Sequence, residues 1–551
     1  MRRSGMQVMM RLVGLVKPLA GFMVLAVAMG TLGHLCATFI PVFAGYSLLH
    51  AIRYPSILSM GWLMALMVLL AFARALLKYG EQACNHYIAF RLLALIRDRV
   101  FKALRRLSPA KLEGRDRGDL ISLITSDVEL LEVFYAHTIS PVCIVVIYTV
   151  AMTVFIGAHS LALGMMAVFS YLAIGVALPM LTSQRSGKIG YLLRKESGAL
   201  SSLVLDNMRG LREIIQYEKT DSRMNRMKEA TDDLLLLQEE AKQVEGRNSA
   251  ETGVLIYFFD VLFVIAAATL HGRGQISFGE ALVTSLCFLS SFGPVSALAM
   301  LGSTLSNTIA AGNRVLDILD DVPLTKEITG MEEVSFNGAA LKDVGFAYGT
   351  ENILDRFSLD VPGGKAIGIF GPSGVGKSTV LKLLMRFWDV QQGSVEIAGR
   401  NVKQINTSNL RDMEGFMRQE TYLFHDTIKN NIRIGRLNAT DEEIKEACRK
   451  ASIDEFIASL TNGYDTQVGE LGDTLSSGEA QRIGLARVFL HDAPLILLDE
   501  PVASLDALNE GVILRSLKEE TIGKTIVLVS HRASALRICN ETISMESDRA
   551  V

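Results

Sequence analysis

The stretch Gly371-Pro372-Ser373-Gly374-Val375-Gly376-Lys377-Ser378-Thr379 decides the fold of the C-terminal half of the chain. It fits the pattern G-x-x-x-x-G-K-[ST], in which a glycine-rich loop cradles phosphate groups. The apolar run 365–370 predicts a buried strand before the loop, and 380–385 predicts a helix after it. The motif requires this strand–loop–helix setting, so we favour a phosphate-binding loop over an ordinary glycine turn.

The residue types of this loop predict a site for a nucleotide and its magnesium ion. Glycines allow backbone conformations that are closed to other residues, so successive N–H groups can face one polyphosphate at the positive end of a helix. Lys377 is expected to reach the terminal phosphates and Ser378 the magnesium ion. The predicted nucleotide-binding residues of the loop are Gly371, Ser373, Gly374, Gly376, Lys377, Ser378 and Thr379.

Length and composition indicate a membrane protein joined to a soluble one. The chain has 551 residues, too many for one ordinary core, and half of them are hydrophobic. The formal net charge of −3 gives no electrostatic reason to expect nucleic acid as a partner. We therefore expect at least two domains and a lipid bilayer, but no nucleic acid, among the partners.

Long apolar runs in the N-terminal half predict about six membrane spans, each near the length that a bilayer requires. The first run leads into further hydrophobic segments without a cleavage site, so it is interpreted as a span and not as a signal peptide. The expected spans are about Leu19–Leu49, Ile57–Tyr79, Phe134–Gly157, Leu161–Leu181, Val254–Leu270 and Ala281–Leu301.

Positive charge predicts the orientation of these spans. The segments Arg91–Arg117 and Arg185–Arg247 are rich in Arg and Lys, so these segments and both termini are expected on the cytoplasmic side. Apolar residues at helical spacing in both segments predict that membrane helices continue into the cytoplasm. The turns Glu113–Gly118 and Asn207–Arg212 are either contacts for the soluble half or solvated loops.

A helix break at 320–323 separates the two halves. We expect a transmembrane domain at 1–315, a linker at 316–335 and a nucleotide-binding domain at 336–551. In the last segment strands, helices and glycine turns alternate, which predicts an α/β domain with a largely parallel sheet.

Two further motifs in the C-terminal half predict chemistry at the phosphates. The run 494–500 is an apolar strand that ends in two acids. Asp499 is placed to hold magnesium, and Glu500 to orient and activate the attacking water. The segment Leu475–Glu479 opens a helix whose N-terminus can bind a phosphate.

The order of these motifs resembles the ATPase domain of an ABC transporter, and the spans resemble the exporter-type membrane domain fused to it. The resemblance implies an all-α six-helix transmembrane domain of ABC exporter type, followed by an α/β P-loop ABC ATPase domain. It also implies hydrolysis of ATP with Mg²⁺ to drive alternating access. The motifs in order are the phosphate loop, Gln419, Leu475–Glu479, Asp499-Glu500, Ala503-Ser504-Leu505-Asp506 and Ser530-His531.

The resemblance assigns roles to residues outside the loop. Tyr348 would stack on adenine, for which its π-face is suited, although an ordinary strand aromatic is the alternative. Gln419 would contact magnesium and the water, and His531 would contact the γ-phosphate. The implied catalytic residues are Lys377, Gln419, Glu500 and His531, and the implied magnesium ligands are Ser378, Gln419 and Asp499.

The signature segment departs from the usual L-S-G-G-Q of the family. In the family, Ser476 and Gly478 would complete the ATP site of the facing subunit, and Asp506 would report across the dimer. Here Ser477 and Glu479 replace the first glycine and the glutamine. Ser477 adds bulk near the partner's phosphate, so the site that this segment completes is expected to be the weaker of two.

One membrane domain with one ATPase domain makes a half-transporter, so the resemblance implies a second ABC half-transporter subunit. Within the family, Lys78–His86, Leu107–Ala110, Gly118–Leu120 and Ile139–Pro141 are similar to the CydC-type subunit of CydDC transporters. That similarity favours a heterodimer in the cytoplasmic (inner) membrane of a bacterium, with the ATPase domain in the cytoplasm. It implies haem or a small thiol, cysteine or glutathione, as cargo.

His86 is the residue that this similarity connects with haem. It matches the family's histidine implicated in haem binding, and an imidazole is a good axial ligand for iron. A histidine hydrogen-bonded between helices is the alternative. Gln82 stands where members of the family can carry arginine, which weakens any parallel with propionate binding.

Two other functions remain open at this point. The first is a subunit of a heterodimeric multidrug or lipid exporter, which an apolar patch in the cavity would favour over a cavity-facing His86. The second is a ligand-sensing regulatory ABC ATPase, which predicts ligand-stimulated hydrolysis without vectorial transport.

Overall fold

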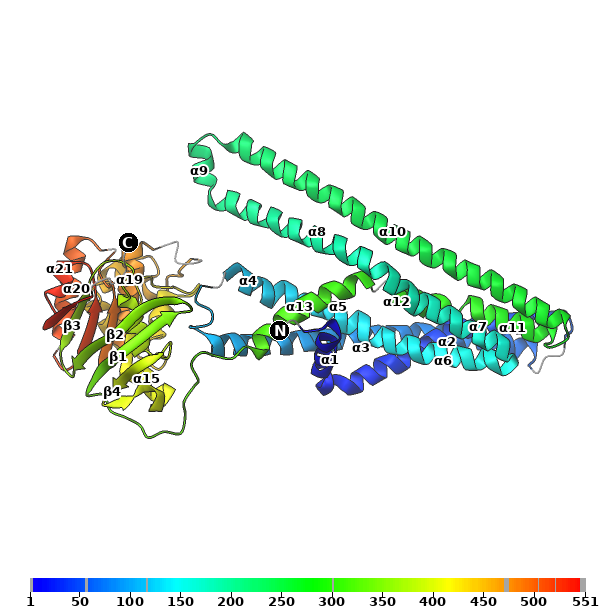
Figure 1. Ribbon diagram of the computed structural model, residues 1–551, viewed down its shortest axis with the longest axis horizontal. Coiled ribbons are helices and arrows are strands. Elements are labelled where there is room, and N and C mark those ends of the chain that lie inside the picture. The colour runs from blue at the N-terminus through cyan, green and yellow to red at the C-terminus, as the bar shows by residue number, and fades with distance from the viewer. Residues whose placement is uncertain are drawn as a thin grey trace. The chain divides into compact units, whose positions relative to one another are not determined.

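The computed structural model describes residues 3–54, 58–114, 117–299, 302–469, 475–503, 505–520 and 522–545. The chain divides into two compact units (Figure 1). The helical unit comprises Met1–Arg106 and Gly114–Asp321, and the α/β unit comprises Leu107–Glu113 and Val322–Val551.

Within the described residues, the helical unit is built from α-helices, a short 3-10 turn at Lys17–Leu19 and three π-helical turns. The π-helical turns are Leu123–Asp127, Tyr135–Ile139 and Ala173–Ala177. The helices are α1 (Gly5–Leu15), α2 (Ala20–Ala51), α3 (Met60–Leu107), α4 (Arg117–Ser122), α5 (Val128–Phe134), α6 (Ser140–His159), α7 (Leu161–Leu172), α8 (Leu178–Arg209), α9 (Leu211–Gln216), α10 (Thr220–Gly272), α11 (Phe278–Leu289), α12 (Phe292–Ala299) and α13 (Gly302–Asp320).

Six helical segments in the described part of the chain are long and apolar enough to cross a membrane, which confirms the predicted six-span domain. The third span was predicted from Phe134, but a π-helical turn comes first and α6 starts at Ser140. Ile57 and residues 300–301, placed in spans by the sequence, lie outside the described residues. The segments are Lys17–Ala51, Met60–Leu107, Ser140–His159, Leu161–Thr182, Thr220–Gly272 and Phe278–Leu298.

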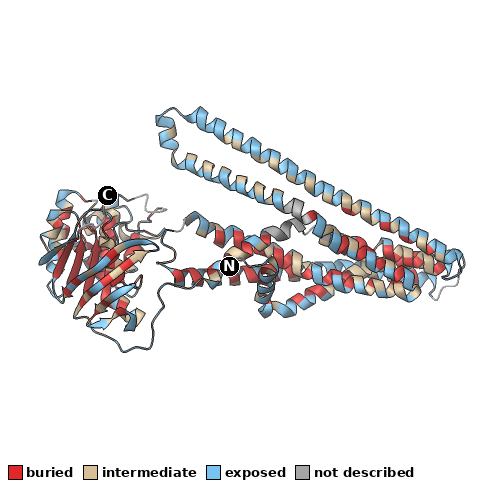
Figure 2. Ribbon diagram, in the orientation of Figure 1, coloured by how far each residue is buried: buried red, intermediate tan, exposed pale blue. Residues whose placement is uncertain are grey.

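Several of these helices are much longer than a bilayer. α3 has 48 residues and α10 has 53, so at 1.5 Å per residue they extend about 72 and about 80 Å, against about 30 Å of hydrocarbon. α8 and α10 run side by side and are joined by α9 (Figure 1). Their ends near α9 are almost entirely exposed (Figure 2).

The membrane-spanning core is held by aromatic packing and by close helix approach. Phe263 of α10 stacks on Phe288 of α11, with ring centroids 4.0 Å apart. α6 and α7 meet where Gly164 faces Gly157, and a Cβ at Gly164 would lie only 2.8 Å from the Gly157 Cα. Small residues allow this approach, because lipid supplies no hydrophobic force between helices and packing must do so.

The α/β unit contains two sheets, of which the sequence predicted one. The parallel sheet has the order β6-β7-β8-β3-β9 and confirms the predicted α/β domain. The second sheet, β2-β1-β4-β5, is antiparallel, because the turn between β1 and β2 has only two residues. The strands are β1 (Gly338–Tyr348), β2 (Glu351–Pro362), β3 (Ala366–Phe370), β4 (Gln392–Ile397), β5 (Arg400–Asn401), β6 (Glu414–Met417), β7 (Leu495–Asp499), β8 (Thr525–Val529) and β9 (Glu541–Ser544).

The register of the parallel sheet brings three loops to one edge. Val529, the last residue of β8, pairs with Asp499 at the end of β7 and with Ile369 near the end of β3. The loops that follow these three strands therefore leave the sheet next to one another. The helices of this unit are α14 (Lys377–Leu384), α15 (Thr407–Met413), α16 (Ile428–Arg433), α17 (Asp441–Lys450), α18 (Asp454–Ser459), α19 (Ser477–His491), α20 (Ala507–Glu520) and α21 (Ala533–Leu536).

The connection into the α/β unit is more ordered than a free linker. α13 runs to Asp320, so residues 316–320 of the expected linker are helical. Farther along, the backbone N–H of Ile328 donates to Thr407 Oγ1 at 2.9 Å. The segment Leu107–Glu113 also packs in this unit, where Glu113 forms an ion pair with Lys382 of α14. Of the expected turn at Glu113–Gly118, residues 115–116 lie outside the described residues.

Candidate active site

The glycine-rich loop between β3 and α14 adopts a conformation that its glycines make possible. Gly374 and Gly376 have φ values of 81° and 104°, which side chains with a Cβ rarely adopt. A Cβ at Gly371 would lie 2.3 Å from the carbonyl oxygen of Met545. The loop is therefore free of side chains where its backbone turns, and Gly376 forms the N-cap of α14.

Two side chains at the start of α14 project back over the loop. The Lys377 ammonium donates to the carbonyl oxygens of Gly371 and Pro372, at 2.9 and 2.8 Å. Ser378 Oγ donates to Asp499 Oδ1 at 2.9 Å. The Lys377 charge is thus held beside the turn where phosphates would bind.

Ser378 and Asp499 fit the magnesium ion that the sequence predicts between them. A hydroxyl and a carboxylate in contact are ligand types that Mg²⁺ uses together with nucleotide phosphates. Asp499 is 6% exposed, and burial raises the pKa of its carboxyl above the ordinary range. A bound cation would lower this pKa again, because a nearby positive charge favours the ionised carboxylate.

The Glu500 carboxylate is held by two side-chain contacts. Its Oε1 lies 2.9 Å from His531 Nδ1, and Ser530 Oγ donates to its Oε2 at 3.2 Å. Its backbone has φ of 51°, a conformation that non-glycine residues adopt mainly where the surroundings enforce it. The carboxylate is thereby fixed beside the cavity in a position suited to a general base.

Gln481 is a positioning residue that the sequence analysis missed. It is 2% exposed on α19, and its Nε2 donates to the backbone carbonyl oxygen of Glu500 at 2.7 Å. This bond holds the peptide that follows Glu500 while the Glu500 N–H donates to Val529. The sequence analysis gave Gln481 no motif, so only the tertiary contact reveals its role.

Replacing Gln481 by methionine should lower kcat for ATP hydrolysis about tenfold and leave the KM for ATP unchanged. The change keeps the side-chain size but removes the shorter of two hydrogen bonds to the Glu500 carbonyl oxygen and leaves the one from the Ala503 N–H at 3.3 Å. A lost hydrogen bond of this kind costs about 0.5–1.5 kcal/mol. Steady-state kinetics of the variant test this. A parallel loss in nucleotide binding would instead indicate general disruption of the α/β unit.

The predicted residues from five loops and strands line one cavity of about 550 Å³. Tyr348 meets Phe346 and Trp388 edge to face, with centroids 4.9 and 5.4 Å away, and presents its remaining surface to the cavity. Gln419 follows β6 and is exposed. The lining comprises Tyr348, Glu351, Ile353, Gly371, Ser373, Gly374, Gly376, Lys377, Ser378, Thr379, Gln419, Asp499, Glu500, Val529 and His531.

Three of the predicted nucleotide-binding residues lie outside this cavity. Ser476 and Gly478 are at the N-terminus of α19, where Ser476 Oγ accepts from the Glu479 N–H and the Glu479 carboxylate accepts from the Ser476 N–H. The departure from the usual glutamine at Glu479 thus forms a capping box. Asp506 accepts from the N–H groups of Leu508 and Asn509 at the start of α20. Ser504 lies outside the described residues.

His86 lies in the helical unit, on α3. Its Nε2 is 2.9 Å from Gln82 Nε2, and its ring stacks on Phe90 with centroids 6.0 Å apart. Within the described residues, no group of three His, Cys, Asp or Glu side chains is arranged to hold a metal ion. Gln82 lies four residues before His86 on the same helix, so this contact does not join two helices.

Both halves of the chain match models of one protein family. The model described as ABC transporter transmembrane region matches residues 23–295, and the model described as ABC transporter matches residues 354–503. The match to the second model includes the phosphate loop and Glu500.

Relatives and solved structures agree with these matches over nearly the whole chain. A probable ABC transporter ATP-binding/permease protein of Haemophilus influenzae is 42% identical over 550 residues, which is 100% of both chains. An ATP-dependent lipid A-core flippase of Desulfotalea psychrophila is 28% identical over 88% of this chain and 85% of that one. A fatty acid ABC transporter ATP-binding/permease protein of Mycobacterium bovis is 28% identical over 89% and 77%. A bacterial Atm1-family ABC exporter with ATP bound has a TM-score of 0.83, covering 97% of this chain and 95% of that one at 21% identity, and so has the same fold.

Proposed function

Because the chain belongs to the ABC transporters, we propose that it is one half of a transporter that moves an amphiphilic cargo across a membrane. The α/β unit is an ABC ATPase, and its hydrolysis of ATP is coupled to transport. The helical unit is a multi-pass membrane domain. Alternation of this domain between two faces would carry the cargo across.

The observation that carries this proposal is the single cavity in which the phosphate loop, Asp499, Glu500 and His531 meet. ATP would supply the phosphoryl group in this cavity, and Mg²⁺ would neutralise part of the negative charge of the phosphates. Lys377 would bind the terminal phosphates, and Ser378 and Asp499 would hold the ion. Glu500 would accept a proton from the attacking water, while His531 beside it would contact the γ-phosphate.

A second ABC half-transporter subunit is part of the proposal, and we favour a heterodimer. Ser476 and Gly478, which complete an ATP site in this family, do not line the cavity of their own subunit. A facing ATPase domain would bring its own signature to this cavity and receive Ser476 and Gly478 at the other. The long exposed ends of α8 and α10 offer additional surface for such a partner (Figure 2).

The relatives support an amphiphilic cargo. A lipid A-core flippase and a fatty acid transporter, by their names, handle molecules with polar and apolar parts, and each matches most of this chain. We place the transporter in the cytoplasmic (inner) membrane of a bacterium, with the ATPase domain in the cytoplasm. The basic segments Arg91–Arg117 and Arg185–Arg247, which lie largely within α3 and within α8 to α10, favour that orientation.

A second candidate cargo, haem or a small thiol, follows from the similarity to CydC-type subunits. The observation in its favour is His86, a half-buried imidazole on a long membrane helix whose Nε2 is in contact with Gln82. An imidazole in this setting could bind haem iron as an axial ligand if Gln82 moved aside. Haem would then be the cargo or a bound ligand.

Purification with the subunit encoded beside it, followed by ATPase assays, tests these proposals. Lipids and hydrophobic drugs should stimulate hydrolysis if the cargo is a general amphiphile. Stimulation by haem, with a Soret shift that His86→Ala abolishes and Gln82→Ala retains, would favour the CydC-like cargo. Stimulation by cysteine or glutathione alone would favour the thiol, and no stimulation by any class would contradict the proposed transport.

A further inference from the structure

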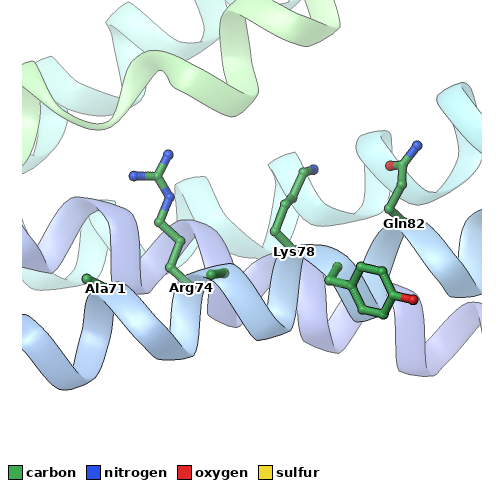
Figure 3. A pocket seen from close by; sticks show the side chains of 6 residues that line it. Ala71, Arg74, Lys78 and Gln82 are labelled. Carbon is green, nitrogen blue, oxygen red and sulfur yellow. The ribbon is translucent and has the colours of Figure 1, made fainter.

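A row of polar side chains runs along α3 inside the membrane-spanning part of the helical unit. Arg74, Lys78 and Gln82 are spaced four residues apart and therefore follow one side of the helix. Figure 3 shows their side chains extending to the same side of α3. Together with Ala71, Ala75 and Tyr79 they line a groove of about 500 Å³.

Arg74 lies at a depth where an unpaired charge is costly. An 18-residue window of the helix Met60–Leu107 has a mean hydropathy of 2.0, and Arg74 is about 21 Å along the helix from Met60. The hydrocarbon core of a bilayer is about 30 Å thick, so the backbone of Arg74 lies within that core. Ionisable residues at such depth face a protein interior or a polar path and mark the passage of ligands.

The charges along this groove do not balance. Lys78 Nζ forms an ion pair at 2.8 Å with Glu81, whose side chain is buried. Arg74 is exposed, and no described residue forms a hydrogen bond or ion pair with it. The groove therefore carries one uncompensated positive charge, supplied by a side chain with a planar, bidentate donor fork.

We propose that Arg74 and Lys78 bind the acid group of the transported amphiphile, a carboxylate or a phosphate. This inference rests on the proposed transport of an amphiphile and names its chemical class. Side chains four residues apart on a helix have Cβ atoms about 5–6 Å apart, so one acid group can contact both cations. Ala71, Ala75 and Tyr79 give the groove an apolar wall along which a hydrocarbon chain can lie.

The ion pair between Lys78 and Glu81 is compatible with the binding of an acid group. Glu81 fixes the position of the Lys78 ammonium through their hydrogen bond. The acid group of a ligand would contact Lys78 in addition to Glu81, and it would place a negative charge beside Arg74. Arg74 thus supplies most of the preference for an acid, because it would give up no hydrogen bond or ion pair with any residue that the structure describes. Gln82, the next residue of the row, is neutral and hydrogen-bonds His86 instead.

The test compares acids with their neutral counterparts in the assembled two-subunit transporter, in nanodiscs of phosphatidylcholine. ATPase half-saturation is measured for oleate against methyl oleate and for dioleoylphosphatidic acid against dioleoylglycerol. At least one acid should act at a concentration about tenfold or more below its neutral counterpart, and Arg74→Gln should remove that preference. The acid with the larger preference identifies carboxylate or phosphate as the group recognised.

Lys102→Met serves as the matched control, because Lys102 lies on the cytoplasmic end of the same helix, where it pairs with Asp98. This variant should keep the full preference for the acid. An equal response of the unmodified transporter to acid and neutral forms, or an undiminished preference in Arg74→Gln, would overturn the site but keep the amphiphilic cargo. Separation of the two subunits in Arg74→Gln would also overturn it, since Arg74 would then pair with an acid of the partner. No response to any of the four amphiphiles would overturn both proposals.

Discussion

Replacing Glu500 by glutamine should slow ATP hydrolysis by about two to four orders of magnitude while ATP still binds. The amide keeps the size of the side chain and can still reach Ser530, but it cannot accept a proton from water. Phosphate release and binding of labelled ATP by the assembled transporter measure the two effects separately.

Glu519→Gln is the matched control for this prediction. Glu519 is an exposed acid on α20 and does not line the cavity, so its loss should leave hydrolysis unchanged. Unchanged turnover in Glu500→Gln would contradict the assignment of the base. Loss of ATP binding together with turnover would mean that the substitution disturbed the loop and not the chemistry.

Replacing Lys377 by alanine should weaken ATP binding about 10- to 100-fold. The ammonium lies beside the turn of the loop, held by two carbonyl oxygens, and its charge-assisted bonds to the terminal phosphates would be lost. The effect should be smaller for ADP than for ATP, because ADP lacks the γ-phosphate that Lys377 contacts. Titration with fluorescent nucleotides measures both affinities.

Lys365→Ala controls for the loss of a positive charge near β3, since Lys365 is exposed at the other end of that strand. It should bind ATP as the native chain does. Equal affinities of Lys377→Ala and the native chain for ATP would contradict the role of the loop.

Features encoded by short contiguous motifs could be predicted from the sequence. The phosphate loop needs Gly371, Gly374 and Gly376 at fixed spacing because its backbone must turn without a Cβ, so the motif implies the geometry. The apolar strand predicted at 494–500, which ends in two acids, is β7, and its last residue in the structure is Asp499. A fully buried run can be recognised in this way because polar residues follow where the strand leaves the core. The six spans could be predicted from the sequence for a similar reason, since a lipid bilayer requires long, uninterrupted apolar helices.

Features that depend on contacts between distant residues could not be predicted. Gln481 donates a hydrogen bond to the Glu500 carbonyl oxygen because the fold brings α19 next to the end of β7. The residues that flank Gln481 in the sequence do not predict this contact. The antiparallel sheet was not predicted, because its order β2-β1-β4-β5 depends on pairing strands of 338–362 with strands of 392–401, which are distant in the sequence. Arg74 lies in a strongly apolar span, so the sequence predicts only a membrane helix there. The proposal for Arg74 needed the fold, in which no described residue forms a hydrogen bond or ion pair with it.

The most direct test of this account is ATP-driven movement of a fluorescent fatty acid between the leaflets of proteoliposomes that contain both subunits. We predict movement with ATP and Mg²⁺ for the native chain, and none for Glu500→Gln at the same protein density. ATP hydrolysis that the fatty acid stimulates without moving it would contradict transport. The chain would then be a ligand-sensing regulatory ATPase.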